Sequence, residues 1–251
     1  MLRALVVLLI AALLLAGAFL TLAPASLIAP RLEKATNGTL SAREVEGTIW
    51  RGRAVLAAGG TPFPLAWAVD ATPLIGGELR AHITGYDPSS PTPRAEVVAD
   101  RRHVDVRNAN VILPATLLMQ ATPLGKIGLV AVGEVEATTP RLDWTPSSIA
   151  GDVRLVWRSA RLTLPPFPSV DLGELTAALV SDGTRLAGPV TNQGGDLDIR
   201  GDASVGSDRS AAVSVLLTPR RSDNTALTNV LATFGKPEGG GWRFAFRTPP
   251  R

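Results

Sequence analysis

Two histidines, His82 and His103, are the only side chains of this sequence that ordinarily titrate near neutral pH. Each lies in a run with the alternating pattern of a β-strand, and neither has the H-E-x-x-H spacing of a zinc protease. The chain has no cysteine, which excludes thiol nucleophiles and cysteine-ligated metals. It also has no G-x-S-x-G motif. We therefore predict that the protein is not an enzyme and that both histidines are ordinary strand residues.

Three carboxylates, Asp196, Asp198 and Asp202, come nearest to a metal site, because hard cations such as Ca²⁺ prefer oxygen ligands. Their spacing fits no EF-hand loop, Arg200 interrupts the cluster, and the segment alternates like a strand. Gly125-Lys126 lacks the other residues of a phosphate-binding loop and is assigned to a turn. The sequence thus predicts no metal site and no cofactor.

A run of glycines, arginines and a tryptophan, G-T-I-W-R-G-R-A over residues 47–54, is the strongest candidate for a functional motif. In one interpretation the tryptophan, flanked by arginines, contacts a partner protein or lipid headgroups. In the other it packs over a β-bulge at the glycines and fills the edge of a core. Both interpretations stay open here, and the candidate structural or partner-contact residues are Gly47, Thr48, Trp50, Gly52 and Arg53.

The elements that would position these residues are mostly strands. Apolar and polar residues alternate over short runs that glycines and prolines separate, which is typical of β-strands joined by turns. Phe63, Leu65, Trp67 and Val69 share one parity and predict one buried strand face. Asp182-Gly183 predicts a type I′ hairpin turn. The pattern indicates a mainly β fold, a curved antiparallel sheet in meander order.

One or two short helices are expected within this β-domain. Leu113–Gln120 has an apolar side and begins near Pro114, which suits the first turn of a helix. Ser222–Phe234 has apolar residues at helical spacing and is followed by a Gly-Lys-Pro stop. The last run, Trp242–Arg247, predicts an amphipathic closing strand with aromatic residues on one face and arginines on the other.

The N-terminal region differs from the rest, because residues 4–29 contain no charged side chain. Ala4–Leu22 is apolar over a length that suffices to span a bilayer as a helix. The alternative is a cleaved signal peptide, with Arg3 as its basic start and Ala23-Pro24-Ala25 as its cleavage site. Such peptides normally have a shorter apolar stretch, so we favour an uncleaved anchor. Both interpretations export the remainder of the chain.

The predicted organisation has four parts: a cytoplasmic leader (1–3), a transmembrane helix (4–23), a linker with an amphipathic exit (24–38) and a periplasmic β-rich domain (39–251). The proline-rich segment 88–93 is a candidate boundary between two lobes of that domain. Basic residues nearly balance across the apolar segment, so the positive-inside rule alone does not fix its orientation. We favour a cytoplasmic N-terminus because a short leader before a long exported domain is a common arrangement.

Composition narrows the class of protein further. The net charge of +3 is small for 251 residues, and no basic run interleaved with aromatic residues is present, so nucleic acid is not a predicted partner. Apolar residues make up 45% of the chain, which is enough for a packed core and argues against disorder.

The order and spacing of several motifs resemble the type II secretion system protein N family, also called general secretion pathway protein N. The first of them, Gly47–Ala54, is similar to the family's G-T-[VIL]-W-x-G-x-A signature. The similarity covers essentially the whole chain, including the N-terminal apolar segment, and is strongest in the C-terminal half. The other motifs that carry it are Trp67 with Pro73-Leu74 and Gly77, Ala150–Val153 with Trp157, Ala160 and Leu162, Leu172–Leu175, Gly188–Gly201, Leu217–Arg220 and Phe234–Pro237.

This resemblance implies a bacterial inner-membrane protein with a single transmembrane span and the bulk of its chain in the periplasm. It implies an accessory role in the machinery that exports folded proteins across the outer membrane. That role uses contacts with other type II secretion subunits and no catalytic residues. Pro189 departs from an ideal strand pattern, so the strand around Val190 is expected to be absent or to lie at a sheet edge.

One alternative function from a different class stays open. A membrane-anchored periplasmic β-sheet with an apolar inner face could bind or transfer lipid by shielding acyl chains. An open apolar groove on the concave face would favour the lipid function, and a face filled by side chains would favour the secretion component. An exported hydrolase is disfavoured because no nucleophile motif is found.

Overall fold

The computed structural model describes residues 23–35, 38, 40–58, 61–70, 76–85, 94–120, 128–221 and 225–248. The predicted leader, all but Ala23 of the predicted transmembrane helix, and the segment 88–93 lie outside these residues. Within the described part of the chain, no helix combines the length and the apolar character needed to cross a membrane. The anchor and the lobe boundary therefore stay predictions from the sequence.

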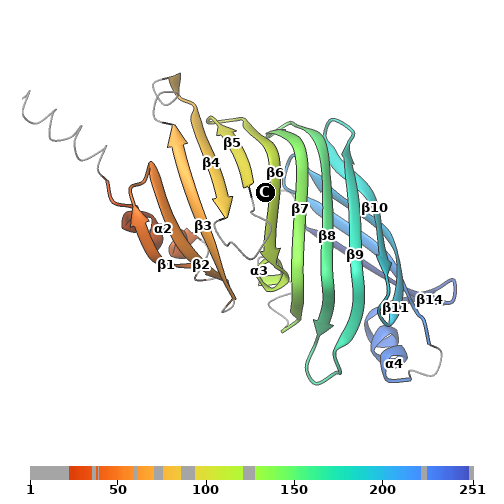
Figure 1. Ribbon diagram of the computed structural model, residues 1–251. Coiled ribbons are helices and arrows are strands. Elements are labelled where there is room, and N and C mark those ends of the chain that lie inside the picture. The colour runs from red at the N-terminus through yellow and green to blue at the C-terminus, as the bar shows by residue number, and fades with distance from the viewer. Residues whose placement is uncertain are drawn as a thin grey trace, which may run out of the picture.

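The strands form one 14-stranded sheet whose order follows the chain, except that β14 lies between β12 and β13 (Figure 1). All neighbouring strands are antiparallel, which confirms the predicted meander. The strands are β1 (Leu40–Gly47), β2 (Arg51–Ala58), β3 (Thr61–Asp70), β4 (Leu79–Gly85), β5 (Arg94–Ala99), β6 (Val104–Pro114), β7 (Val130–Thr145), β8 (Ser148–Thr163), β9 (Val170–Ser181), β10 (Arg185–Gln193), β11 (Leu197–Gly206), β12 (Ala211–Pro219), β13 (Lys236–Glu238) and β14 (Gly241–Thr248).

Short helices accompany the sheet: η1 (Ala25–Leu27), α2 (Ile28–Ala35), α3 (Ala115–Gln120) and α4 (Thr225–Phe234). Helix α2 contacts β1, α3 contacts β6 and β7, and α4 contacts β12 and β14. Both helices predicted within the β-domain are present. Pro114 is still the last residue of β6, opposite Glu134, so α3 begins one residue later than the proline predicted.

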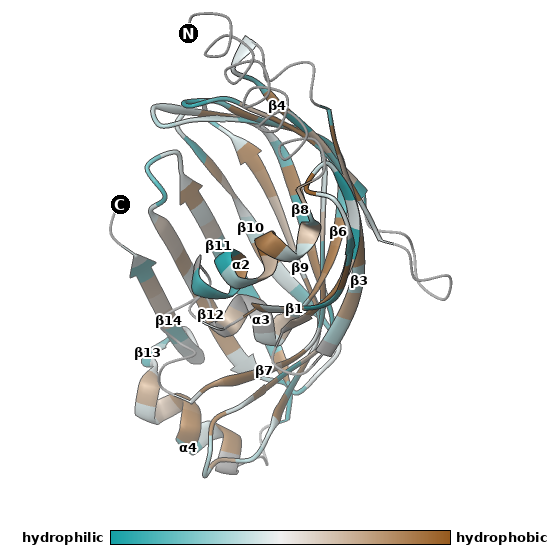
Figure 2. Ribbon diagram, turned by 90° about the vertical axis from the view of Figure 1, so that its left-hand side faces the viewer, coloured by the Kyte–Doolittle hydropathy of each residue, from teal (hydrophilic) through white to brown (hydrophobic). Residues whose placement is uncertain are grey.

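Strand register gives the sheet two chemically different faces. Residues directly opposite each other on neighbouring strands point to the same face, so a row of paired residues can be followed across the sheet. One such row is apolar from β6 to β14: Val111, Ala137, Leu155, Ala177, Val190, Gly201, Val215 and Phe244. The next row, on the other face, is Ile112, Glu136, Val156, Thr176, Thr191, Arg200, Leu216 and Arg243. We call these the inner and outer faces; the sheet curves toward the inner face (Figure 2).

Glycine bulges allow the long central strands to curve together. Gly151 in β8 has φ 127°, and a Cβ atom there would overlap the carbonyl oxygen of Arg141 in β7. The β7–β8 register shifts beside this contact, between Thr138 and Leu142. A bulge bends its strand and increases its twist, so this bulge in β7, which Gly151 of β8 accommodates, contributes to the curvature.

The best-buried core lies where α4 packs on the inner face of the C-terminal half. Leu227 and Leu231 of α4 are each 4% exposed and contact a cluster of strand residues. That cluster includes Leu197 and Ile199 of β11, with Trp242 among its partly buried members. A second small cluster gathers around Ile149, Leu179 and Leu186. The aromatic face predicted for the closing strand is therefore confirmed as a core face.

The expectation for the strand around Val190 is wrong. Strand β10 lies inside the sheet between β9 and β11, with Pro189 paired to Asp202 of β11. The pairing of β10 with β9 passes over Gly188 and Pro189. Since proline lacks an N–H donor, it is tolerated where the ladder on one side is already interrupted.

The hairpin at Asp182-Gly183 is present between β9 and β10, but the type I′ prediction is wrong. That turn needs a positive φ at both central residues, and Asp182 has none, whereas Gly183 has φ 99°. The Asp182 carboxylate instead accepts hydrogen bonds from the backbone N–H groups of Thr184 and Arg185, each at 3.0 Å. Asp182 thus stabilises the turn through its side chain.

Candidate functional site

The G-T-I-W-R-G-R motif forms the turn between β1 and β2. The Thr48 hydroxyl oxygen accepts hydrogen bonds from the backbone N–H groups of Trp50 at 3.3 Å and Arg51 at 3.1 Å. The backbone N–H of Thr48 donates to the Arg51 carbonyl oxygen at 2.7 Å. Gly47 has φ 88°, and a Cβ there would overlap that same carbonyl oxygen. Gly47 and Thr48 are therefore explained by the geometry of the turn.

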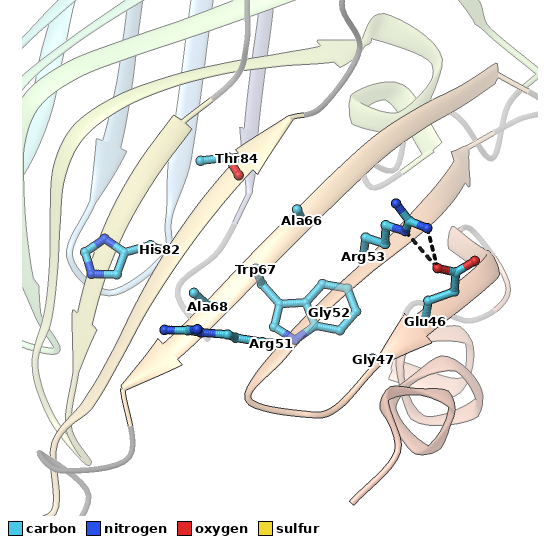
Figure 3. A pocket seen from close by; sticks show the side chains of 10 residues that line it. All are labelled: Glu46, Gly47, Arg51, Gly52, Arg53, Ala66, Trp67, Ala68, His82 and Thr84. Carbon is cyan, nitrogen blue, oxygen red and sulfur yellow. Dashed lines mark hydrogen bonds and ion pairs between the residues drawn. The ribbon is translucent and has the colours of Figure 1, made fainter. Parts of the chain in front are cut away.

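Trp67 of β3 packs over Gly52, the second glycine of the motif. Gly52 pairs with Trp67, and a Cβ on Gly52 would lie 2.5 Å from Cζ2 of the indole (Figure 3). The Trp67 Nε1–H donates to the Ile49 carbonyl oxygen at 3.2 Å, which fixes the ring against the turn. Gly52 is therefore explained by its packing against Trp67, a residue of the next strand along the chain. Both interpretations of Trp50, a partner contact or a core-edge residue, stay predictions.

A hollow of about 520 Å³ lies beside this turn (Figure 3). Its small residues, Ala66 and Ala68, come from β3 and are paired with Arg53 and Arg51 of β2. On the other side of β3, Ala68 is paired with His82 of β4. The hollow exists because alanines stand between rows of longer side chains. Its lining is Glu46, Gly47, Arg51, Gly52, Arg53, Ala66, Trp67, Ala68, His82 and Thr84, which includes three of the five predicted motif residues but neither Thr48 nor Trp50.

The electrostatics of the hollow favour an anionic contact. Arg53 is held by Glu46, with Nε–H donating to a carboxylate oxygen at 2.8 Å, and both side chains are more than half exposed. His82 lies 3.8 Å from the Asp70 carboxylate. Arg51 is exposed, and no acidic side chain pairs with it in the part of the chain that the structure describes. One uncompensated guanidinium beside a shallow depression suits a carboxylate or another anion on a partner.

Replacing Trp67 with phenylalanine is expected to destabilise the protein by about 1 kcal/mol or more, because the Ile49 carbonyl loses its donor and the smaller ring loses part of its packing. Urea unfolding of the full chain, followed by circular dichroism, measures the change. Trp242→Phe controls for the loss of ring volume, since Trp242 also packs in a core and no indole hydrogen bond of Trp242 is found among the described residues. Equal midpoints for Trp67→Phe and the unmodified chain would contradict this role for the indole.

A second cluster of titratable groups lies on the outer face between β6 and β7. Asp105 is 1% exposed and accepts hydrogen bonds from Arg107 at 2.6 Å and from Arg141 at 3.2 Å. Burial raises the pKa of the Asp105 carboxyl, but the hydrogen bonds and charges of the two arginines outweigh it and hold that pKa below its usual value. The cluster is a network of ion pairs and provides no free base.

His103 extends this network and lies just before β6, not within a strand as predicted. Its Nε2 is 3.0 Å from the Asp143 carboxylate, and the pKa of His103 is raised mainly by this hydrogen bond. His82 does lie in β4, as predicted. The two histidines are on separate parts of the sheet and do not form one site.

The raised pKa of His103 predicts a pH dependence of stability. The contribution is complete below the ordinary pKa of 6.5 and is lost as pH rises through the higher folded-state pKa. The thermal unfolding temperature is therefore expected to fall as pH is raised from about 6 to about 8.5. His103→Asn should flatten that decline. An unchanged slope in the variant would show that another group is responsible.

The three carboxylates near residue 200 are not gathered into a cage. Asp196 accepts a hydrogen bond from the Asp171 backbone N–H at 3.0 Å, and Asp198 pairs with Arg200 at 3.0 Å. Asp202 is on the outer face, opposite Pro189 and Ser214. Among the described residues, no group of three or more acidic, histidine or cysteine side chains is placed to hold a metal ion.

The fold and this site define a single-sheet β-protein whose polar residues are tied into turns and ion pairs around a basic surface hollow. The sequence profile of one family, described as type II secretion system (T2SS), protein N, matches residues 38–244. The chain therefore belongs to the type II secretion system protein N family, as the motif order predicted. No curated protein and no solved structure matches the chain.

Proposed function

We propose that this protein is an accessory inner-membrane component of the type II secretion machinery. It supports protein export from the periplasm across the outer membrane through non-catalytic contacts with other secretion subunits. The observation that carries the proposal is the family match, which spans residues 38–244 and so includes nearly the entire β-domain. The charge-free run at residues 4–22 supports a single-pass anchor that holds this domain at the membrane.

Two surfaces of the sheet suit contacts with partner subunits. The first is the hollow around Arg51, which offers an exposed cation next to small residues. The second is the end of the sheet at β14, because β13 pairs only with residues 241–243. The remaining outer edge of β14, residues 244–248, has no strand beside it in the described part of the chain. An unpaired edge can accept a strand from another protein.

Affinity purification of the tagged full chain from its native bacterium, after chemical crosslinking in the cell, tests the proposal. Secretion subunits should be recovered with the unmodified protein. Arg51→Glu should lower their recovery about tenfold if reversal of this charge costs about 1.4 kcal/mol of binding. Arg154→Glu is the matched control, since Arg154 is also an exposed outer-face arginine and lies far along the sheet in β8.

The two variants separate the family role from the site. If Arg51→Glu and Arg154→Glu reduce the recovery of secretion subunits equally, the hollow is rejected as the contact surface. Failure to recover any secretion subunit with the unmodified chain, together with normal export after gene deletion, would sink the proposed function.

A further inference from the structure

The inner face of the sheet carries no charge at any position that strand register assigns to it in the described residues. In the N-terminal half, the row Val69, Ala81, Val97, Val106 and Leu142 continues the apolar surface from β3 to β7. In the C-terminal half, the row from Val111 to Phe244 continues it to β14. Arg107 and Arg141 are the neighbours of the inner pair Val106 and Leu142, so they lie on the outer face. The positive φ of Asn108, 46°, and the β7 register shift between Thr138 and Leu142 mark the irregularity that keeps both Val106 and Val111 on the inner face.

This apolar face is only partly covered. No second sheet faces it within the described chain, and the helices meet it locally, α4 at one end and α3 near β6 and β7. Between these helices the inner residues Leu155 and Ala177 pack against the small cluster around Ile149 and stay half-buried. Val205 and Val213, also on the inner face, are each 38% exposed. Large exposed apolar patches mark interaction sites in stable proteins, and the exposed part of this face is a candidate for one.

The chemistry of the face favours an acyl chain over a polypeptide. The backbone N–H and C=O groups of the central strands are paired within the sheet, so the inner face offers few partners to an incoming extended peptide. Its charge-free lining offers no ion pair either. An acyl chain needs neither, and each buried CH₂ group contributes about 0.8 kcal/mol. Figure 2 shows the sheet curved around this face, which increases the contact with a flexible chain.

The place of the sheet directly after the apolar N-terminal run indicates that the acyl chains come from membrane lipids. The first described residue, Ala23, directly follows the charge-free run 4–22 that is long enough to span a bilayer. The Ala23 carbonyl oxygen accepts a hydrogen bond from Ile49, which ties this start to the β1–β2 turn. We infer that the inner face binds acyl chains of membrane phospholipids, a lipid-binding activity beyond the proposed protein contacts.

Photocrosslinking with a defined lipid tests this inference. The full chain is reconstituted into vesicles of phosphatidylethanolamine and phosphatidylglycerol that contain phosphatidylglycerol with a diazirine in its acyl chain. After illumination, mass spectrometry locates the labelled residues. Label is expected on inner-face residues such as Leu155, Ala177 and Val213, and at least about tenfold less on the outer-face neighbours Val156 and Thr176.

A negative charge introduced on one face or the other provides the matched comparison. Ala177→Asp, on the inner face, should reduce acyl labelling of the sheet about tenfold, whereas Thr176→Asp, the next residue on the outer face, should leave it unchanged. Ala177→Trp fills the same space without charge and should also reduce labelling, which keeps the test valid if the aspartate variant does not fold. Circular dichroism monitors folding in each case.

Three results would overturn the inference: equal labelling of the two faces, label confined to residues 1–22, or inner-face labelling that both Ala177 variants leave unchanged. Label found instead on another polypeptide seated against the inner face would assign that face to a protein partner. Because the measurement uses purified protein and lipid, it can fail while the secretion role holds, and the reverse is also true.

Discussion

Gly151→Ala is expected to destabilise the protein by about 3 kcal/mol, the sum of the strain of a positive φ and the overlap of the new Cβ with the Arg141 carbonyl oxygen. Gly183→Ala is the matched control. Gly183 also has a positive φ, 99°, but a Cβ there meets no atom within 4 Å. It should therefore cost only the backbone strain, about 1 kcal/mol.

Urea unfolding of both full-length variants measures this difference, with the midpoint and slope compared to the unmodified chain. Gly151→Ala should unfold at a clearly lower urea concentration than Gly183→Ala. Equal losses would mean that the close approach of β7 and β8 at this bulge contributes nothing, and that the bulge is not a fixed part of the curved sheet.

The second large effect is expected when both arginines around Asp105 are removed. Arg107→Leu combined with Arg141→Leu leaves a carboxylate that is 1% exposed without its two charged donors. A buried charge that loses its partners typically costs about 3–5 kcal/mol. Chemical unfolding at pH 7 measures the loss, and Arg154→Leu, at an exposed arginine elsewhere on the outer face, should stay within about 0.5 kcal/mol of the unmodified chain.

Adding Asp105→Asn to the double variant separates the charge from the packing. The neutral amide no longer requires a cation, so part of the lost stability should return. Lowering the pH should also help the double variant, because protonation of Asp105 removes the same unpaired charge. A triple variant less stable than the double variant would show that the arginines act through their packed aliphatic stems.

The mainly β class and the meander order could be predicted because strand signals are local. The alternation in Phe63, Leu65, Trp67 and Val69 defines β3 without any knowledge of its neighbours. Strand β13 was not predicted, because three residues interrupted by Pro237 carry no periodic signal. The error at Pro189 also comes from information that is not local. A proline fits into β10 because the hydrogen-bond ladder to the neighbouring strand β9 is interrupted beside it.

The candidate site was predicted in part. The glycines and Thr48 of the turn could be recognised because they act locally. The packing of Trp67 on Gly52 and the placement of Ala66, Ala68 and His82 beside Arg51 depend on β2–β3 and β3–β4 register, which sequence alone does not fix. The alanines were the available signal, since small residues between longer outer-face side chains leave a depression.

Export of a type II cargo protein in the native bacterium tests the central claim most directly. Cargo activity is measured in the culture medium and in the periplasm of the parent strain, of a strain with this gene deleted, and of the deleted strain carrying the full chain. The account predicts that the deletion retains cargo in the periplasm and that the full chain restores its release. Equal release from the parent and the deleted strain would contradict a role of this protein in type II secretion.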